Sequence, residues 1–177
     1  MPIMKWGYTL KKIIIIFALL ISTALYAQNG ERIDVVFHNF PWGTSMREFK
    51  AKMGEPVQVE NNNGFQSLLY DNIQMSGYPV FMLVYFSQNG LEGGTYYFNT
   101  FNQEELMQCY TTIQGELLEK YGPTPVYYPI LKEAFPYISY WDLGTGYVQL
   151  RVDTRRNEPV TLWYSSPRLT ELVFGKR

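Results

Sequence analysis

The chain has 177 residues, a formal net charge of −1, 17% aromatic residues, one cysteine and one histidine. A single cysteine excludes an intramolecular disulfide. With one histidine and one cysteine, the chain lacks the ligands of the usual zinc site and the bases of a histidine-based catalytic triad. The near-neutral charge, with no basic patch beyond Arg155-Arg156, argues against a nucleic-acid partner.

The first 27 residues have the pattern of a signal peptide, with lysines ahead of an uncharged apolar run from Ile13 to Ala27. That run is shorter than the roughly 18 residues or more expected of a membrane-spanning helix. We expect cleavage after Ala27. An uncleaved N-terminal anchor is the alternative, because Leu25 stands where a small residue is preferred.

Residues 28–177 are expected to form one domain, since about 150 residues can bury most of the surface that the unfolded chain exposes. The export signal predicts a periplasmic or secreted protein with no membrane span after cleavage. No cysteine stands directly after the apolar run, which excludes the usual lipid anchor of bacterial lipoproteins.

Two helices are predicted from their caps and periodicity. Ser45 and Glu48 form a capping box for a short helix that ends at Gly54. A second box at Asn102 begins a longer helix, 103–121, which ends before Gly122-Pro123. An apolar stripe on the longer helix is expected to pack against a sheet: Leu106, Cys109, Tyr110, Ile113 and Leu117.

Eight strands are predicted from runs of β-branched and aromatic residues: 57–60, 65–70, 80–86, 95–98, 126–128, 137–141, 147–152 and 160–164. Short connections between them, including Asp71-Asn72, Gly90 to Gly94 and Gly144 to Gly146, have turn composition and predict antiparallel neighbours. Each predicted helix is followed by four strands. The sequence therefore predicts an α+β fold, an antiparallel sheet with two helices on one face, built from a tandem repeat over about 40–100 and 101–167.

The run Phe40-Pro41-Trp42-Gly43-Thr44-Ser45, followed by Phe49, Gly54 and Pro56, resembles the opening of BamE-type assembly lipoproteins and their uncharacterised relatives. In those proteins the first helix starts at such a turn and ends in Gly-x-Pro. The tandem form is similar to the β-lactamase inhibitory protein, in which two such units build one sheet with a concave binding face. The resemblance implies a fold more strongly than a function. The chain departs from the BamE-type pattern by lacking the lipid-anchor cysteine and by being doubled.

The residues that could carry catalysis have simpler structural interpretations. His38 is expected to be hydrogen bonded or solvated, and Cys109 lies on the apolar stripe of the longer helix. Asp142 and Asp153 are the nearest pair of acids, but they flank a hairpin whose turn and strand end explain them. We predict no catalytic residues, no metal site and no cofactor.

Strand alternation predicts a binding face in the second half of the chain. Val148, Leu150 and Val152 alternate with polar or aromatic residues, which indicates one buried and one wet face. Phasing the other strands to match assigns to the wet face Tyr137, Trp141, Tyr147, Arg151 and Trp163. Aromatic residues with one cation are typical of binding hot spots. The alternative is that the segment from Leu169 to Phe174 folds over this face and converts it into a second small core.

The sequence thus predicts an exported, non-enzymatic binding or inhibitor-like module that recognises another protein through an aromatic sheet face. The alternatives are a carbohydrate-binding module and a cell-envelope hydrolase. A broad, shallow aromatic face would favour the first, and a deep pocket with converging acids would favour the hydrolase.

Overall fold

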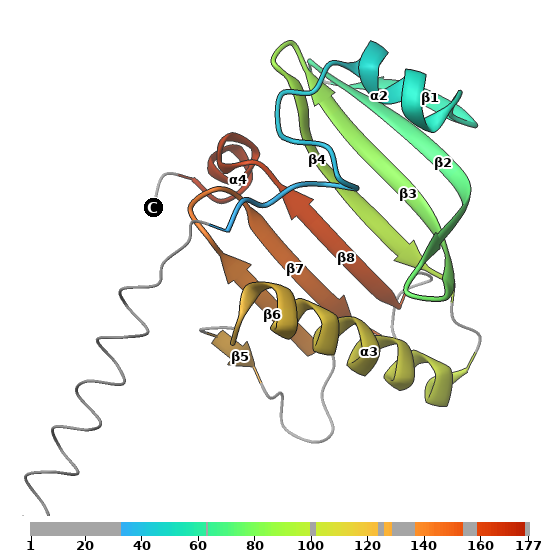
Figure 1. The fold of residues 1–177 in the computed structure, drawn as a ribbon, viewed down its shortest axis with the longest axis vertical. Coiled ribbons are helices and arrows are strands. Elements are labelled where there is room, and N and C mark those ends of the chain that lie inside the picture. Colours follow the sequence, from blue (N-terminus) through green and yellow to red (C-terminus); the bar gives the residue numbers. More distant parts are fainter. Residues whose placement is uncertain are drawn as a thin grey trace, which may run out of the picture. The chain divides into compact units, whose positions relative to one another are not determined.

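The structure is a computed structural model that describes residues 33–62, 64–99, 102–123, 126–128, 137–153 and 159–175. These residues belong, apart from Ile33, to a compact unit that spans Asp34–Arg177 (Figure 1). The expected signal segment, residues 1–27, lies outside the described residues, so its cleavage stays a prediction.

Both expected helices are present with the expected caps. Helix α2 spans Met46–Met53, and the Ser45 side chain accepts a hydrogen bond from the Glu48 backbone. Helix α3 spans Gln103–Tyr121, and Asn102 caps it through Glu105. A third helix, α4 (Pro167–Phe174), follows the last strand and is capped by Ser166. These caps satisfy backbone donors at each first turn, which is why short polar residues precede all three helices.

Eight strands form one antiparallel sheet in the order β1-β2-β3-β4-β8-β7-β6-β5. Their bounds are β1 (Gln58–Asn62), β2 (Phe65–Met75), β3 (Tyr78–Ser87), β4 (Gly90–Phe98), β5 (Val126–Tyr128), β6 (Tyr137–Asp142), β7 (Tyr147–Val152) and β8 (Val160–Ser165). The α+β fold with helices on an antiparallel sheet is confirmed.

The two halves of the chain meet at the centre of this sheet. The first half runs α2-β1-β2-β3-β4 and the second runs α3-β5-β6-β7-β8, and their last strands, β4 and β8, pair with each other. Two similar units that pair through their last strands would give this strand order. Duplication of an ancestral unit nevertheless stays a prediction.

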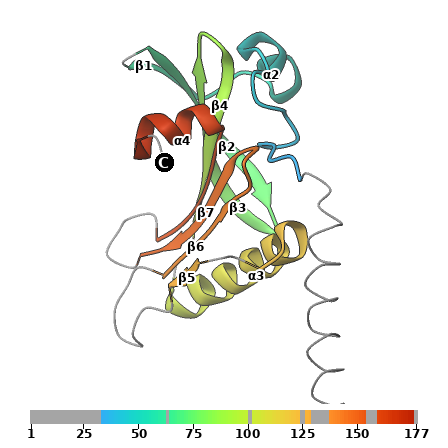
Figure 2. The same ribbon diagram turned by 90° about the vertical axis from the view of Figure 1, so that its left-hand side faces the viewer.

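The inner face of the sheet, which we define as the face that α2 and α3 cover, holds the core (Figure 2). The α2 residue Phe49 packs on Tyr70 and Phe86, with ring centroids 6.0 and 5.5 Å apart. The predicted stripe of α3 is buried: its five residues are at most 4% exposed. Burial of large apolar side chains from both helices is the main source of stability in a fold without disulfides.

A turn before α2 adds to the inner face. Phe37 and Phe40 exchange backbone hydrogen bonds around His38 and Asn39, whose φ angles are 50° and 65°. The Phe37 ring, fully buried, lies 5.0 Å from Tyr96 and occupies the space that a side chain at Gly94 would need. Gly94 is therefore a strand residue that admits Phe37, and the expectation that Gly90 to Gly94 form a turn was wrong.

Asp71-Asn72 is also not a turn. The register jumps from Tyr70↔Met82 to Ile73↔Val80, so β2 carries one residue more than β3 at this point and forms a β-bulge. The actual turn between β2 and β3 is Ser76-Gly77, with φ of 53° and 83°. Along the described ranges, no helix is both long and apolar enough to cross a membrane.

Candidate binding surface

The outer face of the sheet, opposite α2 and α3, carries three of the five predicted site residues. Trp163 pairs with Gln149, Arg151 with Thr161, and Tyr147 with Ser165, on the side opposite the buried Leu150 and Leu162. The Tyr147 and Trp163 ring centroids are 5.4 Å apart. The structure therefore brings together Tyr147, Arg151 and Trp163.

Tyr137 and Trp141 lie on the inner face, so their predicted position was wrong. Trp141 pairs with Val148 and is 1% exposed, and its Nε1 donates to the Gly122 carbonyl at 2.9 Å. Tyr137 pairs with Val152 and its ring lies 6.1 Å from that of Tyr110. Strand β6 thus points the opposite set of side chains inward.

The reason is a buried polar contact at Ser139. Ser139 is fully buried beside Leu150, and its hydroxyl lies 2.9 Å from the Tyr110 hydroxyl and accepts from Gln114 at 3.0 Å. These partners on α3 satisfy the hydroxyl inside the core. Ser139 points inward together with Tyr137 and Trp141, because residues two apart on a strand share a face.

Helix α4 covers one end of the outer face. Its Phe174 ring lies 5.6 Å from Tyr147 and 5.8 Å from Trp163. Tyr147 is consequently 4% exposed, whereas Trp163 and Arg151 remain half-buried. The alternative that the C-terminal segment covers the predicted face thus holds for Tyr147, whereas Trp163 contacts Phe174 and stays half-buried (Figure 2).

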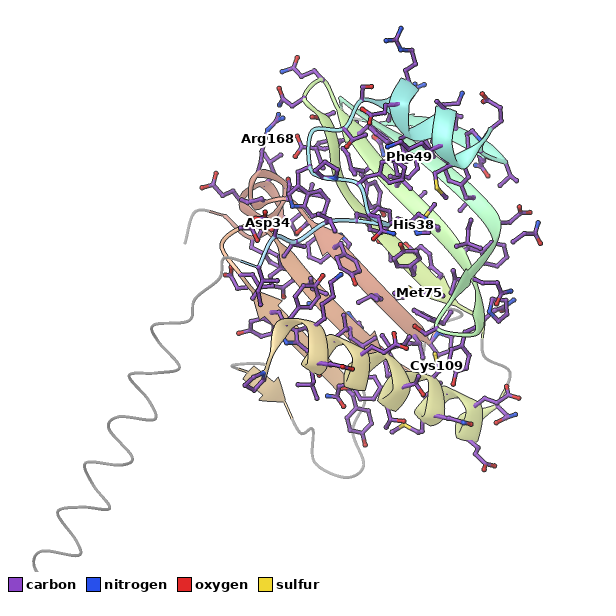
Figure 3. All side chains as sticks on the ribbon, in the orientation of Figure 1. Asp34, His38, Phe49, Met75, Cys109 and Arg168 are labelled. Carbon is purple, nitrogen blue, oxygen red and sulfur yellow. The ribbon has the colours of Figure 1, made fainter. Side chains whose placement is uncertain are left out.

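A buried carboxylate anchors the start of α4. Glu92, 4% exposed, accepts hydrogen bonds from Ser166 at 2.6 Å, Ser87 at 2.7 Å and Arg168 at 2.7 Å (Figure 3 labels Arg168). Burial alone would raise the pKa of Glu92, but these three hydrogen bonds and the Arg168 charge outweigh it and lower the pKa. On the same side, the Leu169 side chain lies where a side chain at Gly93 would point.

The outer face continues across the first half of the chain, where no site residue was predicted. One row across the sheet joins Leu69, Leu83, Thr95, Trp163, Gln149 and Tyr140, and the next joins Phe81, Tyr97, Thr161, Arg151 and Ile138. Most of these side chains are half-buried, and Phe81 is 44% exposed. Strand β3 is apolar on both faces, so its alternation carries no polar signal that marks the outer one.

The two rows contain one charged side chain, Arg151. Its Nη2 donates to Asp153 at 2.7 Å, and Asp153 is 3% exposed. Within the described residues, the Arg151 Nε is buried and makes no hydrogen bond. The central outer face is therefore a largely aromatic and aliphatic surface that also holds the uncharged polar residues Thr95, Gln149 and Thr161 and one locally neutralised cation.

The catalytic candidates do not converge. Asp153 pairs with Arg151, whereas Asp142 is exposed and accepts from the Gly144 backbone at 3.4 Å. His38 Nδ1 lies 2.9 Å from the Tyr96 hydroxyl, and burial lowers the pKa of His38. Burial also raises the pKa of the fully buried Cys109 thiol to about 12. Figure 3 shows His38 in the segment before α2 and Cys109 on α3.

Within the residues that the structure describes, no three His, Cys, Asp or Glu side chains come together where they could hold a metal ion.

Three solved bacterial structures are similar in backbone path. A DUF4309 family protein, YjgB, from Bacillus subtilis shares 14% identity over 73% of this chain and 82% of its own, with a TM-score of 0.46. A cysteine-rich secretory protein from Staphylococcus aureus shares 9% over 71% and 44%, with a TM-score of 0.40. An extracellular protein containing an SCP domain from Bacillus anthracis shares 12% over 79% and 50%, with a TM-score of 0.43.

No protein-family model matches the chain, and no curated protein matches it. The resemblance to BamE-type proteins and the β-lactamase inhibitory protein therefore stays a prediction. Because the identities and TM-scores of the solved structures are low, the functional conclusions rest on this chain's own geometry.

Proposed function

We propose that this chain is an exported, non-enzymatic binding module that recognises another protein through the outer face of its sheet. The observation that carries the proposal is the pair of neighbouring rows that cross the central strands with Arg151 as their one charged side chain. Two large aromatic residues of these rows, Tyr97 on β4 and Trp163 on β8, are half-buried and so present ring surface to solvent.

The end of α4 extends this surface. Leu172, Val173 and Phe174 are 61%, 56% and 47% exposed, and Phe174 contacts Trp163. Contiguous apolar surface of this kind on a folded protein is typical of interaction sites. Tryptophan, tyrosine and arginine are enriched among the few residues that carry most of the binding energy in protein interfaces.

The chemistry of the face specifies the partner's surface. A partner that buries the two rows has to bring apolar or aromatic groups, because a charge placed against them would lose its hydration without gaining an ion pair: the one cation is already neutralised by Asp153. We therefore propose a protein with an uncharged, aromatic or aliphatic contact surface in the cell envelope or outside the cell.

A photo-crosslinking experiment tests the proposal. A photoreactive phenylalanine analogue replaces Tyr97 on the outer face or, as the control, Leu118, which is 39% exposed on α3. In the producing cells, an adduct with one protein is expected from position 97 and not from position 118. Adducts of the same protein from both positions, or from neither, would contradict the outer face as the docking surface.

The crosslinked partner then allows a quantitative test. Trp163→Ala should weaken its binding by about 2 kcal/mol or more, the effect typical of an interface hot spot. The matched control Val59→Ala changes a 47% exposed residue on edge strand β1 and should leave binding unchanged. Wild-type affinity in the Trp163→Ala variant would refute the assigned site.

A further inference from the structure

A second site lies on the outer face at the far end of β4 from α4. A cavity of about 350 Å³ is lined by Asp71, Asn72, Gln74, Pro79, Val80, Phe81 and Asn99. Its volume falls within the range of small-molecule sites, roughly 300–1,000 Å³. Whereas Gly93 at the start of β4 contacts α4, Asn99 follows the last residue of the same strand.

The β-bulge in β2 builds this cavity. Asp71 and Asn72 together oppose a single residue of β3, Phe81, because β2 carries the extra residue here. Asn72 adopts a left-handed backbone conformation, with φ of 56°, which asparagine tolerates better than most residues. Bulges redirect side chains next to functional sites, and this one places a carboxylate and an amide across from an aromatic ring.

The polar side chains of the residues that line the cavity are three uncharged amides and one carboxylate. The amides of Asn72, Gln74 and Asn99 can each donate and accept hydrogen bonds. Asn72 Nδ2 donates to Asp71 Oδ1 at 2.9 Å, which orients that carboxylate and leaves its second oxygen to accept. Beside them Phe81 presents a ring that is 44% exposed.

These groups select one class of ligand. A sugar ring has an apolar face of C–H groups, and its neighbouring hydroxyls both donate and accept. An exposed aromatic ring next to amides and a carboxylate matches both features. Among the described residues, no lysine or arginine lines the cavity, which disfavours an anionic ligand, and the one carboxylate found there is too few for a divalent cation. We infer that this cavity binds a neutral saccharide, with Phe81 as the stacking platform.

The site shares Phe81 with the second row of the proposed protein-binding face, but its polar groups, Asp71, Asn72, Gln74 and Asn99, lie outside both rows. The test uses the full exported chain with three neutral probes, cellotetraose, chitotetraose and xylotetraose, and one acidic probe, tetragalacturonate. Isothermal titration calorimetry measures each affinity. Binding of at least one neutral probe, and weaker or absent binding of the acidic one, is expected.

Three variants of the cavity make the test specific. Phe81→Leu keeps an apolar side chain and loses the ring, so affinity should fall about tenfold, while Phe81→Trp should retain it. Asn99→Ala should also weaken binding about tenfold through lost hydrogen bonds. The controls make the same changes elsewhere: Phe174→Leu, at a residue 47% exposed on α4, and Asn89→Ala in the β3–β4 turn should bind as the wild type does.

The outcomes that overturn the inference are equally definite. Absence of binding by all three neutral probes does so, as does a Phe81→Leu variant with unchanged affinity. If no saccharide binds even to the wild type, and Phe81→Leu weakens binding of the crosslinked protein partner, Phe81 belongs to the protein interface. Trp163→Ala should leave saccharide affinity intact, which separates failure of this site from failure of the proposed function.

Discussion

The two faces of the sheet are built from the same strands and differ in what covers them. On the inner face, which α2 and α3 cover, Val148, Leu150 and Leu162 are fully buried. On the outer face, helix α4 has eight residues and none of them is buried. The difference indicates that stability resides mainly in the inner face, which leaves the outer face free to change its contacts without loss of the fold.

The largest expected effect on stability comes from replacing one of the two tryptophans of the second half, Trp141, by alanine. Trp141→Ala removes a 1% exposed ring from the inner face and leaves the Gly122 carbonyl without its donor, so it should cost about 3–5 kcal/mol of unfolding free energy. Trp163→Ala, on the outer face, should cost clearly less. Urea unfolding measures both.

Equal costs for the two variants would abolish the distinction between the faces. A Trp163→Ala variant as destabilised as Trp141→Ala would show that α4 and Trp163 form a second core, and loss of partner binding in that variant would then reflect unfolding. The melting temperature of each variant therefore has to accompany every binding measurement.

The helices could be predicted from the sequence because their signals are local. Ser45 and Asn102 cap the first turns, and Gly54 and Gly122 terminate the helices with φ of 85° and 79°. None of these signals depends on a distant residue. The prediction of both helices and of the α3 stripe was confirmed for that reason.

The facing of β6 could not be predicted because its signal is non-local. In Tyr137-Ile138-Ser139-Tyr140-Trp141 both alternating sets are apolar apart from Ser139, and Ser139 turns inward because of Tyr110 and Gln114 on α3. Two of the five predicted site residues were misplaced by this one polar contact. The bulge at Asp71-Asn72 was missed because turn-forming residues also suit a bulge.

A smaller effect is expected where the inner face is most tightly packed. Gly94→Ala would place a methyl group against the buried Phe37 ring, and overpacking of this kind costs about 1–3 kcal/mol. Thermal unfolding measures it. The double variant Gly94→Ala/Phe37→Ala removes the clash and should be no less stable than Phe37→Ala alone; a further loss would place the strain in the backbone of β4.

The anchor of α4 provides a prediction with a pH dependence. Glu92→Gln should cost about 1–3 kcal/mol at neutral pH, because it removes charge-assisted hydrogen bonds from Arg168 and Ser166. The folded pKa of Glu92 is below the ordinary value of 4.5, so its contribution is complete above that pH and is lost as the pH falls through the folded pKa. The stability difference between wild type and variant should therefore shrink below about pH 4.5. A difference that stays constant to lower pH would contradict the anchoring role of the ionised carboxylate.

The smallest expected effect is a gain of stability on the solvent side of α3, the helix that covers the inner face. Gly115 lies in the middle of α3, is exposed, and has nothing within 4 Å of the position that a side-chain carbon would take. Gly115→Ala should stabilise the protein by about 0.5–1 kcal/mol, because alanine lowers the backbone entropy of the unfolded chain and favours the helix. Gly122→Ala serves as the control at the end of the same helix: it also meets no atom within 4 Å, but its φ of 79° strains any side chain, so it should destabilise. Chemical unfolding of the two variants separates helix propensity from packing, since neither methyl group touches the core. A loss of stability in Gly115→Ala would mean that the exposed side of α3 is itself covered, and a third packed surface would then have to be added to the comparison of the two faces.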